Sequence, residues 1–174
     1  MDENIVLVDI FDNEIGYGEK LNTHILEKLH RAFSLFIVRE GKILIQKRAE
    51  DKYHSGGLWA NSCCSHHRYG MDFDTSVRER VREELGINSE KFDYKELFGF
   101  VYYAKFDKLA EYEYDHVLLS DYSGEITPNK NEMSEIRWID IDTLKEELEK
   151  EPQKFSAWFL ICAPKVIEYV KNNM

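Results

Sequence analysis

The stretch WANSCCSHH, residues 59–67, places two adjacent cysteines and two adjacent histidines within a few positions. Residues of these types bind metals, act as catalytic thiols, or simply pack in a core. A structural zinc site usually has paired cysteines about two to four residues apart and a second pair further along the chain. The only other cysteine is Cys162, so that pattern is not met. The neighbouring motifs must decide which thiol and which imidazole act chemically.

A second candidate is the acidic segment EYEYDH, residues 111–116. In an extended strand Glu111, Glu113 and Asp115 share one face, with successive members about 7 Å apart. Either a solvent-facing edge or a bound cation can relieve their repulsion, and both interpretations stay open. Carboxylates combined with imidazoles suit zinc, manganese or magnesium. Imidazoles are available at His24, His30 and His66, although a lone histidine is more often structural.

A third candidate is the helix predicted to begin at Asp72 or Asp74 and to end at Leu85. Helical geometry places Glu84 and Arg80 at the border of its apolar stripe, whereas Glu83 points away from that stripe. Glu84 is then either half of an ion pair on a solvated helix or a carboxylate that faces a cleft. Magnesium on Glu84, together with basic side chains, would make a diphosphate site from Lys20, Arg48, Lys52 and Arg80.

The elements that must position these residues alternate between strands and helices. Residues 32–38 and 43–47 read as a β-hairpin, 49–60 as a loop, and 98–106, 111–122 and 135–141 as further strands. A helix is expected from Asp140 or Asp142, and another from Phe155, interrupted at Pro164. The pattern predicts an α/β (α+β) layered sandwich.

Composition limits the class of protein. With 174 residues and 43% hydrophobic content, the chain is expected to form one domain, residues 1–174. It lacks an apolar run of about 20 residues and a signal-like N-terminus, which favours the cytoplasm. The net charge of −10 argues against a nucleic-acid partner. A small phosphorylated substrate remains compatible, because a pocket can be locally positive.

Taken together, several ordered motifs resemble the type I isopentenyl-diphosphate Δ-isomerases, enzymes with the Nudix fold. They span about Lys20 to Trp158 and comprise THILEKLHRAFS (23–34), QKRAEDKYHSGGLWANSCCSHH (46–67), REELGI (82–87), EYE (111–113) and FSAW (155–158). The resemblance implies a Nudix-type α/β/α sandwich with a mixed β-sheet. It also implies a metal-dependent interconversion of isopentenyl and dimethylallyl diphosphate, a step of isoprenoid biosynthesis.

The resemblance assigns roles position by position. The catalytic residues would be Cys64, Glu113 and Tyr102, and Cys63 would be a neighbour only, as would His67. One divalent metal, Mn²⁺, Zn²⁺ or Mg²⁺, would be bound by His24, His30, His66, Glu111 and Glu113. Glu84 would hold Mg²⁺ together with the backbone carbonyl of Cys64. The diphosphate contacts would be Lys20, Arg48, Lys52 and Arg80, and Trp158 would form the aromatic wall over the hydrocarbon.

The chemistry requires one proton to be added and another removed through a species with carbocation character. Glu113, assisted by Tyr102, is expected to protonate the alkene on one face, while Cys64 transfers a proton on the other, and the direction can reverse. The expected partner is a small isoprenoid diphosphate, without nucleic acid or membrane, and the expected state is a monomer or weak homodimer. Two rival hypotheses are a Nudix pyrophosphohydrolase and a non-catalytic metal-binding module.

Overall fold

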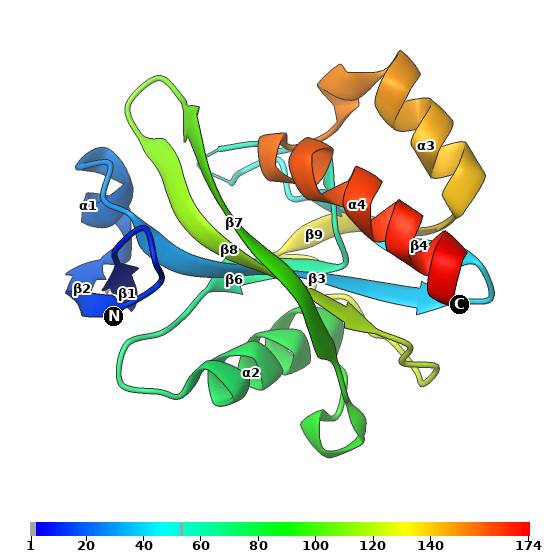
Figure 1. Ribbon diagram of the computed structural model, residues 1–174, viewed down its shortest axis with the longest axis horizontal. Coiled ribbons are helices and arrows are strands. Elements are labelled where there is room, and N and C mark those ends of the chain that lie inside the picture. Colours follow the sequence, from blue (N-terminus) through cyan, green and yellow to red (C-terminus); the bar gives the residue numbers. More distant parts are fainter. Residues whose placement is uncertain (1–2, 53) are drawn as a thin grey trace.

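The computed structural model describes residues 3–52 and 54–174 (Figure 1). Its strands are β1 (Asn4–Val8), β2 (Glu14–Glu19), β3 (His30–Arg39), β4 (Lys42–Arg48), β5 (Trp59–Ala60), β6 (Cys63–His66), β7 (Lys95–Lys105), β8 (Ala110–Ser120) and β9 (Met133–Asp140). Its α-helices are α1 (Lys20–Ile25), α2 (Phe73–Leu85), α3 (Ile141–Lys150) and α4 (Ala157–Asn173). Short 3-10 turns lie at Ser89–Lys91 and Pro152–Lys154.

Strand β3 organises the sheet. One of its edges pairs in parallel with β8, and the opposite edge pairs antiparallel with β1, β6 and β4 in turn. β6 takes the stretch from Ala32 to Leu35 and β4 the stretch from Ile37 to Arg39, so these two strands share one edge of β3 at successive positions. β7 extends the sheet beyond β8, and β9 extends it beyond β4, while β5 pairs with the end of β4 on the same edge as β3. The sheet is therefore mixed, as predicted.

Helices cover both faces of this sheet, as Figure 1 shows with α2 on one side and α3 and α4 on the other. Alternate residues of β3 point to opposite faces, so Leu35 and Ile37 pack with Val81 of α2. Phe36 and Val38 pack instead with Phe159 of α4. The α/β/α layering follows from this alternation, because each sheet face needs an apolar cover.

The sequence predicts helix α2 because its start and stop signals are local. Asp72 is the N-cap, and its carboxylate accepts from the backbone N–H of Thr75 at 2.9 Å. At the other end Gly86 adopts a left-handed φ of 65°, which ends the helix without the penalty a Cβ would bring. Asp140 caps α3 in the same way, so the first of the two alternatives was right in each case.

One expectation about α4 was wrong. Pro164 does not interrupt the helix, which runs continuously from Ala157 to Asn173. Pro164 itself is exposed, whereas Ala163 and Val166 of the same helix are buried in the core against the sheet. This packing keeps the segment helical despite the missing backbone donor. The predicted loop 49–60 likewise ends in a short strand, β5.

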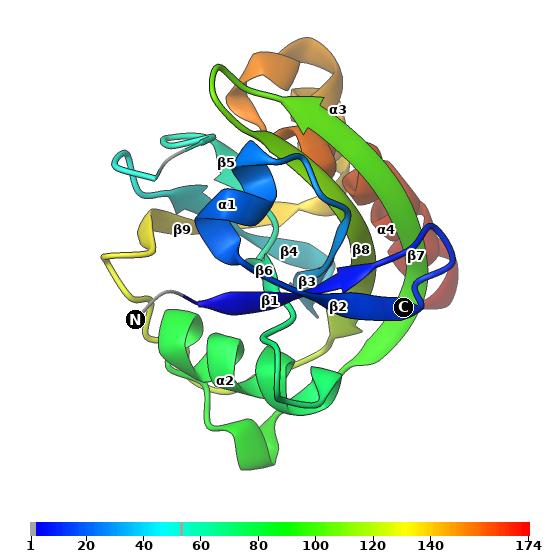
Figure 2. The same ribbon diagram turned by 90° about the vertical axis from the view of Figure 1, so that its left-hand side faces the viewer.

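The N-terminal region adds elements that the pattern analysis did not predict. β1 and β2 form an antiparallel pair, and α1 follows directly. Figure 2 shows α1 in front of the sheet when the molecule is seen from this side, and α1 contacts β2 and β8. None of the described helices is long and apolar enough to cross a membrane.

Candidate active site

A cavity opens where β4 and β6 meet β3 and β8. Most of the predicted site residues line it, namely Lys20, Arg48, Lys52, Cys64, His66, Arg80, Glu84, Tyr102, Glu111, Glu113 and Trp158. The other two, His24 and His30, are fully buried and reach the glutamates of this cavity from α1 and β3. The structure thus brings all of the predicted residues together.

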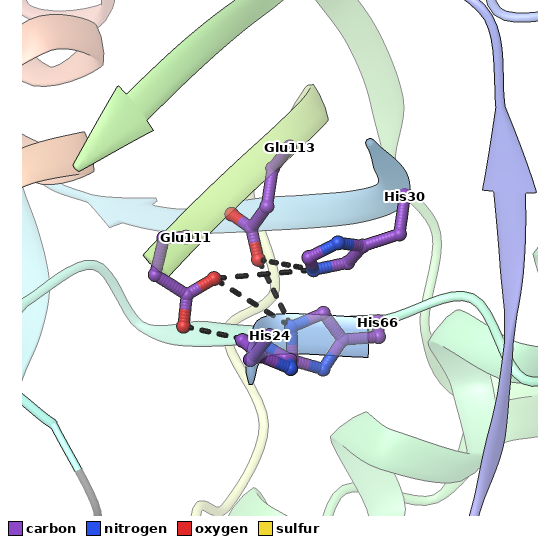
Figure 3. Close-up of side chains that lie close together, drawn as sticks. All are labelled: His24, His30, His66, Glu111 and Glu113. Atoms are coloured by element: carbon purple, nitrogen blue, oxygen red, sulfur yellow. Dashed lines mark hydrogen bonds and ion pairs between the residues drawn. The ribbon is translucent and has the colours of Figure 1, made fainter. Parts of the chain in front are cut away.

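Strand register explains why distant residues converge. His30 lies opposite Glu113 in the β3–β8 pairing, and Ala32 lies opposite His66 in the β3–β6 pairing. Paired residues and residues two apart share a face, so these side chains point the same way. Glu111 precedes Glu113 by two positions on that face. Figure 3 shows the five side chains pointing toward one another.

The cluster has the geometry of a metal site. One potential ligand atom from each of His24, His30, His66, Glu111 and Glu113 lies within 4.8 Å of all the others, and all five side chains are buried. His24 Nδ1 contacts the Lys20 carbonyl at 2.6 Å, and His30 Nδ1 contacts the Lys28 carbonyl at 2.8 Å. Such contacts fix the tautomer with N–H on Nδ1, which leaves Nε2 as a lone-pair donor aimed at the carboxylates.

Two orphaned atoms support the same interpretation. His30 Nε2 and Glu111 Oε2 are buried and have no hydrogen-bond partner among the described residues. They lie 3.9 Å apart. Unpartnered buried polar atoms are costly, and a cation between them would remove that cost. The solvent-edge alternative for the acidic strand is wrong, since Glu111, Glu113 and Asp115 are all buried.

Electrostatics keep both glutamates ionised. Burial raises the pKa of Glu111, but the neighbouring His24, His54 and His66 imidazoles outweigh it, so the pKa lies well below its usual value. For Glu113, burial and the Glu111 charge raise the pKa. The contacts with His30 and His66 have a larger opposite effect, so the pKa of Glu113 also lies below its usual value. Tyr102 donates its hydroxyl to Glu113 Oε2 at 2.5 Å. Burial raises the pKa of Tyr102 well above its usual value, so this tyrosine remains a donor.

The adjacent cysteines face opposite sides of β6. Cys64 lines the cavity, and the Arg48 guanidinium lies 3.6 Å from its sulfur. Burial raises the pKa of the Cys64 thiol to about 12, against the opposing effect of Arg48, so the thiol is protonated at neutral pH. Cys63 is fully buried in the core under α2, with its sulfur 3.3 Å from Glu84 Oε2.

An aromatic wall adjoins Cys64. Trp158 is buried at the start of α4, and its indole N–H donates to Asn61 Oδ1 at 2.9 Å. The Arg48 guanidinium lies 5.3 Å from the centre of the indole ring. The face of this ring therefore already attracts a cation.

The basic residues are held by carboxylates. Arg80 bonds Glu84, whose pKa burial raises in spite of the arginine. Lys52 donates to Glu132 at 2.6 Å, and Lys20 to Glu3 at 3.3 Å. These pairs place Lys52, Arg80 and two carboxylates at one end of the cavity. Such an arrangement can bind an anion together with a divalent cation.

Two ionisable residues of the cavity were not predicted from the sequence. His54, in the segment between β4 and β5, is buried and pairs with Glu111 through Nε2. Glu132, just before β9, pairs with Lys52 and lies 3.7 Å from Arg80. Both lie on irregular segments, where neither periodicity nor strand alternation indicates the direction of a side chain. The expected neighbour His67 does not line the cavity, and it contacts Arg31 and the Met71 carbonyl instead.

Comparisons with known proteins agree with this geometry. The NUDIX domain family matches residues 28–159. A protein of Aromatoleum aromaticum, "Isopentenyl-diphosphate Delta-isomerase 1", is 42% identical over 96% of this chain and 94% of its own length. An "Isopentenyl-diphosphate Delta-isomerase" of Burkholderia multivorans is 41% identical over 91% of this chain and 90% of its own. The chain belongs to the isopentenyl-diphosphate Delta-isomerase family. The resemblance found in the sequence motifs is thereby confirmed.

Solved structures support the fold of this isomerase family member. A protein of Deinococcus radiodurans superposes with a TM-score of 0.76 at 16% identity, covering 94% of this chain and 98% of its own. A MutT protein of Methanosarcina mazei gives 0.65 at 17% identity, covering 84% and 96%. At these identities the likeness concerns the fold alone, and it confirms the Nudix-type sandwich.

Proposed function

We propose that the chain interconverts isopentenyl diphosphate and dimethylallyl diphosphate by metal-dependent protonation and deprotonation. The observation that carries the proposal is one cavity lined by both Cys64 and Glu113. These residues lie on β6 and β8, which flank β3 on opposite edges. Both side chains line the same cavity, so a short alkene can lie between two proton-transferring groups.

The protonation states suit this reaction. The Cys64 thiol carries a proton, whereas Glu113 is a carboxylate, so a donor and an acceptor are present together. For Glu113 to act as the donor it must first gain a proton, and Tyr102 assists it by donating a hydrogen bond to Oε2, which orients the carboxyl group. Transfer by positioned groups of this kind typically contributes about 10²–10⁴-fold to the rate.

The five-residue His/Glu cluster fits a divalent metal, because its donor set and orphaned atoms match one. We assign Mn²⁺, Zn²⁺ or Mg²⁺ to it. A bound cation would neutralise the two buried glutamates and hold Glu113 in a fixed orientation. The chain's own residues then exclude water and set the direction of each proton transfer.

We assign Mg²⁺ to Glu84 and the backbone carbonyl of Cys64, with the substrate diphosphate completing the site. Arg80 and Lys52 would exchange their contacts with Glu84 and Glu132 for contacts with phosphate oxygens. Lys20, now paired with Glu3, and Arg48, now beside the Cys64 sulfur, would also contact the diphosphate. Arginine offers bidentate contacts and lysine a compact charge. Binding at this end would place the alkene between Cys64 and Glu113, next to Trp158. The indole face can stabilise cationic character by about 2 kcal/mol in a desolvated site.

The remaining expectations form part of the same proposal. Residues 1–174 act as one domain, a monomer or weak homodimer, in the cytoplasm. The partner is a small isoprenoid diphosphate rather than nucleic acid or membrane, in keeping with the net charge of −10.

The test is to incubate pure protein with isopentenyl diphosphate and a divalent cation in deuterated water. We expect dimethylallyl diphosphate with deuterium in a methyl group, no phosphate release, loss of activity on chelation, and recovery on adding Mg²⁺ with a trace of Zn²⁺ or Mn²⁺. Alkene signals are followed by NMR, and phosphate is assayed in the same tube. Hydrolysis without allylic product would favour a pyrophosphohydrolase. No change under any metal condition would favour a non-catalytic metal-binding module.

A further inference from the structure

A fourth imidazole stands at the edge of the His/Glu cluster. His54 lies in segment 49–58, is 7% exposed, and directs Nε2 at Glu111 Oε1. It is not one of the five residues whose ligand atoms are mutually close. Its position therefore differs from that of the three clustered histidines, because it contacts one carboxylate from outside the group.

The surroundings hold the His54 ring in place. The centre of the Phe106 ring lies 5.0 Å from that of His54, and the Trp158 ring meets it edge-on at 5.9 Å. The residues after His54 turn back toward β4, since the Gly57 N–H donates to the Arg48 carbonyl at 3.1 Å. A Cβ on Gly56 would lie 2.5 Å from the Glu50 carbonyl oxygen, so only glycine fits there. The segment thus presents His54 from a constrained turn.

The two oxygens of Glu111 have different partners. Oε1 receives the His54 contact and also lies 3.3 Å from His24 Nε2. Oε2 has no hydrogen-bond partner among the described residues and lies 3.9 Å from His30 Nε2 and 4.0 Å from His66 Nε2. Because Glu111 is a carboxylate, it can only accept, and His54 Nε2–H must donate. A hydrogen bond on Oε1 restrains rotation of the carboxylate and keeps Oε2 turned toward the cluster.

We propose that His54 is a positioning residue of the metal site, which donates to Glu111 Oε1 and so fixes Oε2 as the ligand atom. The inference rests on the proposed function in one respect, that the cluster binds a divalent metal. Partners that orient a ligand in this way are typically worth about 10–100-fold in metal affinity or activity. His54 also separates the cluster from the aromatic wall, so its loss would admit water beside Glu111.

The experiment measures metal affinity directly. Metal-stripped full-length protein is titrated with Mn²⁺ or Zn²⁺ alone in competition with a chromophoric chelator. His54→Ala removes the donor, and His54→Gln restores an N–H near the position of Nε2. The matched control is His116→Gln, which removes an imidazole from the other face of β8, where it contacts Glu96 and Asp12.

We expect His54→Ala to weaken metal binding by about 10–100-fold, His54→Gln to stay within a few-fold of wild type, and His116→Gln to match wild type. At saturating metal, His54→Ala should regain most of its kcat with little change in KM. Circular dichroism of the metal-free variants checks the fold.

Wild-type affinity in His54→Ala would overturn the inference. Equal weakening in both His54 variants, with one fewer nitrogen ligand on Zn²⁺ by X-ray absorption, would also overturn it, because His54 would then be a direct ligand. Failure of the proposed function looks different, since wild-type protein itself would bind no metal at this site.

Discussion

Neighbouring residues on a strand have opposite surroundings, and β6 shows this with two identical side chains. Cys64 faces the cavity beside Arg48, while Cys63 faces the core under α2 beside Glu84. A thiol transfers a proton better than a hydroxyl because it is more acidic and more polarisable. Only the cysteine on the cavity face is placed to use that property.

We predict that Cys64→Ser lowers isomerase kcat by about 10²–10⁴-fold, the usual contribution of a positioned acid or base. Cys63→Ser should stay within a few-fold of wild type, because serine keeps a donor for Glu84. The measurement is kcat for both variants at equal metal occupancy. Equal losses would show that the assignment within the cysteine pair is wrong.

A second prediction at this scale concerns the carboxylate that Tyr102 contacts. Glu113→Gln should keep the fold and still bind inorganic pyrophosphate with Mg²⁺, yet lose about 100-fold or more in kcat, since an amide neither releases a proton in this range nor ligates metal as well. Calorimetry gives the pyrophosphate affinity, and NMR gives the turnover. Full activity at saturating metal would remove Glu113 from the mechanism.

At the scale of elements, helix α2 is defined by local sequence signals and carries one residue of the site. Its N-cap lies at Asp72, and its last turn carries the buried Glu84 into the cavity. The cap lies at the opposite end of α2 from Glu84, so it stabilises the helix without contacting the site. Because the capping bonds involve only neighbouring residues, their contribution can be tested separately from the site.

Asp72→Ala should lower the free energy of unfolding by about 1 kcal/mol, because the Thr75 N–H loses its acceptor. Asp72→Asn should stay close to wild type, since asparagine is an equally good N-cap. Urea denaturation of the three proteins checks this, and isomerase activity at 25 °C should be unchanged in all of them. An Asn variant as weak as the Ala variant would mean that charge rather than capping is responsible.

Features that depend on local interactions could be predicted from the sequence, whereas features that depend on contacts between distant segments could not. Helix α2 and the β3–β4 hairpin were predictable because their periodicity, caps and turn lie within a short segment. The metal cluster was predictable only as a set of candidates from the residues, since its convergence depends on the parallel pairing that sets His30 opposite Glu113. The motif resemblance, and not the rules of strand pairing, assigned these candidates to one metal site.

Three features were not predicted correctly from the sequence, each for a physical reason. His54 lies on an irregular segment, and its contact with Glu111 spans distant parts of the chain. Glu132 meets Lys52 in the same way. The expected break at Pro164 did not occur, because tertiary packing of the flanking residues outweighs the local propensity.

For the whole molecule, the net charge of −10 does not describe the cavity. Four basic side chains line it, and each one contacts a carboxylate or, for Arg48, the Cys64 sulfur and the Trp158 ring. An entering diphosphate would exchange these contacts rather than meet bare charges. One of these ion pairs, between Lys20 and Glu3, also connects the cavity to the residue that precedes β1.

Glu3 forms this attachment. It precedes β1 and pairs with Lys20 at the start of α1 and with Arg68. Burial raises its pKa, but Lys20 and Arg68 outweigh that effect and bring the pKa from 4.5 to about 2. A folded-state pKa below the unfolded value means that the stabilisation is complete above about pH 4.5 and is lost as the pH falls toward about 2.

We therefore predict that Glu3→Gln lowers the free energy of unfolding at pH 7 by on the order of 1 kcal/mol, after allowance for solvent screening. The difference from wild type should shrink as the pH falls below about 4.5, because protonation removes the same charge from the wild type. Urea denaturation from pH 7 down to the lowest pH at which both proteins fold measures that difference. Glu40→Gln, at an exposed position on the β3–β4 turn, serves as the control and should match wild type throughout. A difference between Glu3→Gln and wild type that stays constant with pH would show that the loss comes from packing, and that the Glu3 charge does not anchor the N-terminal strand.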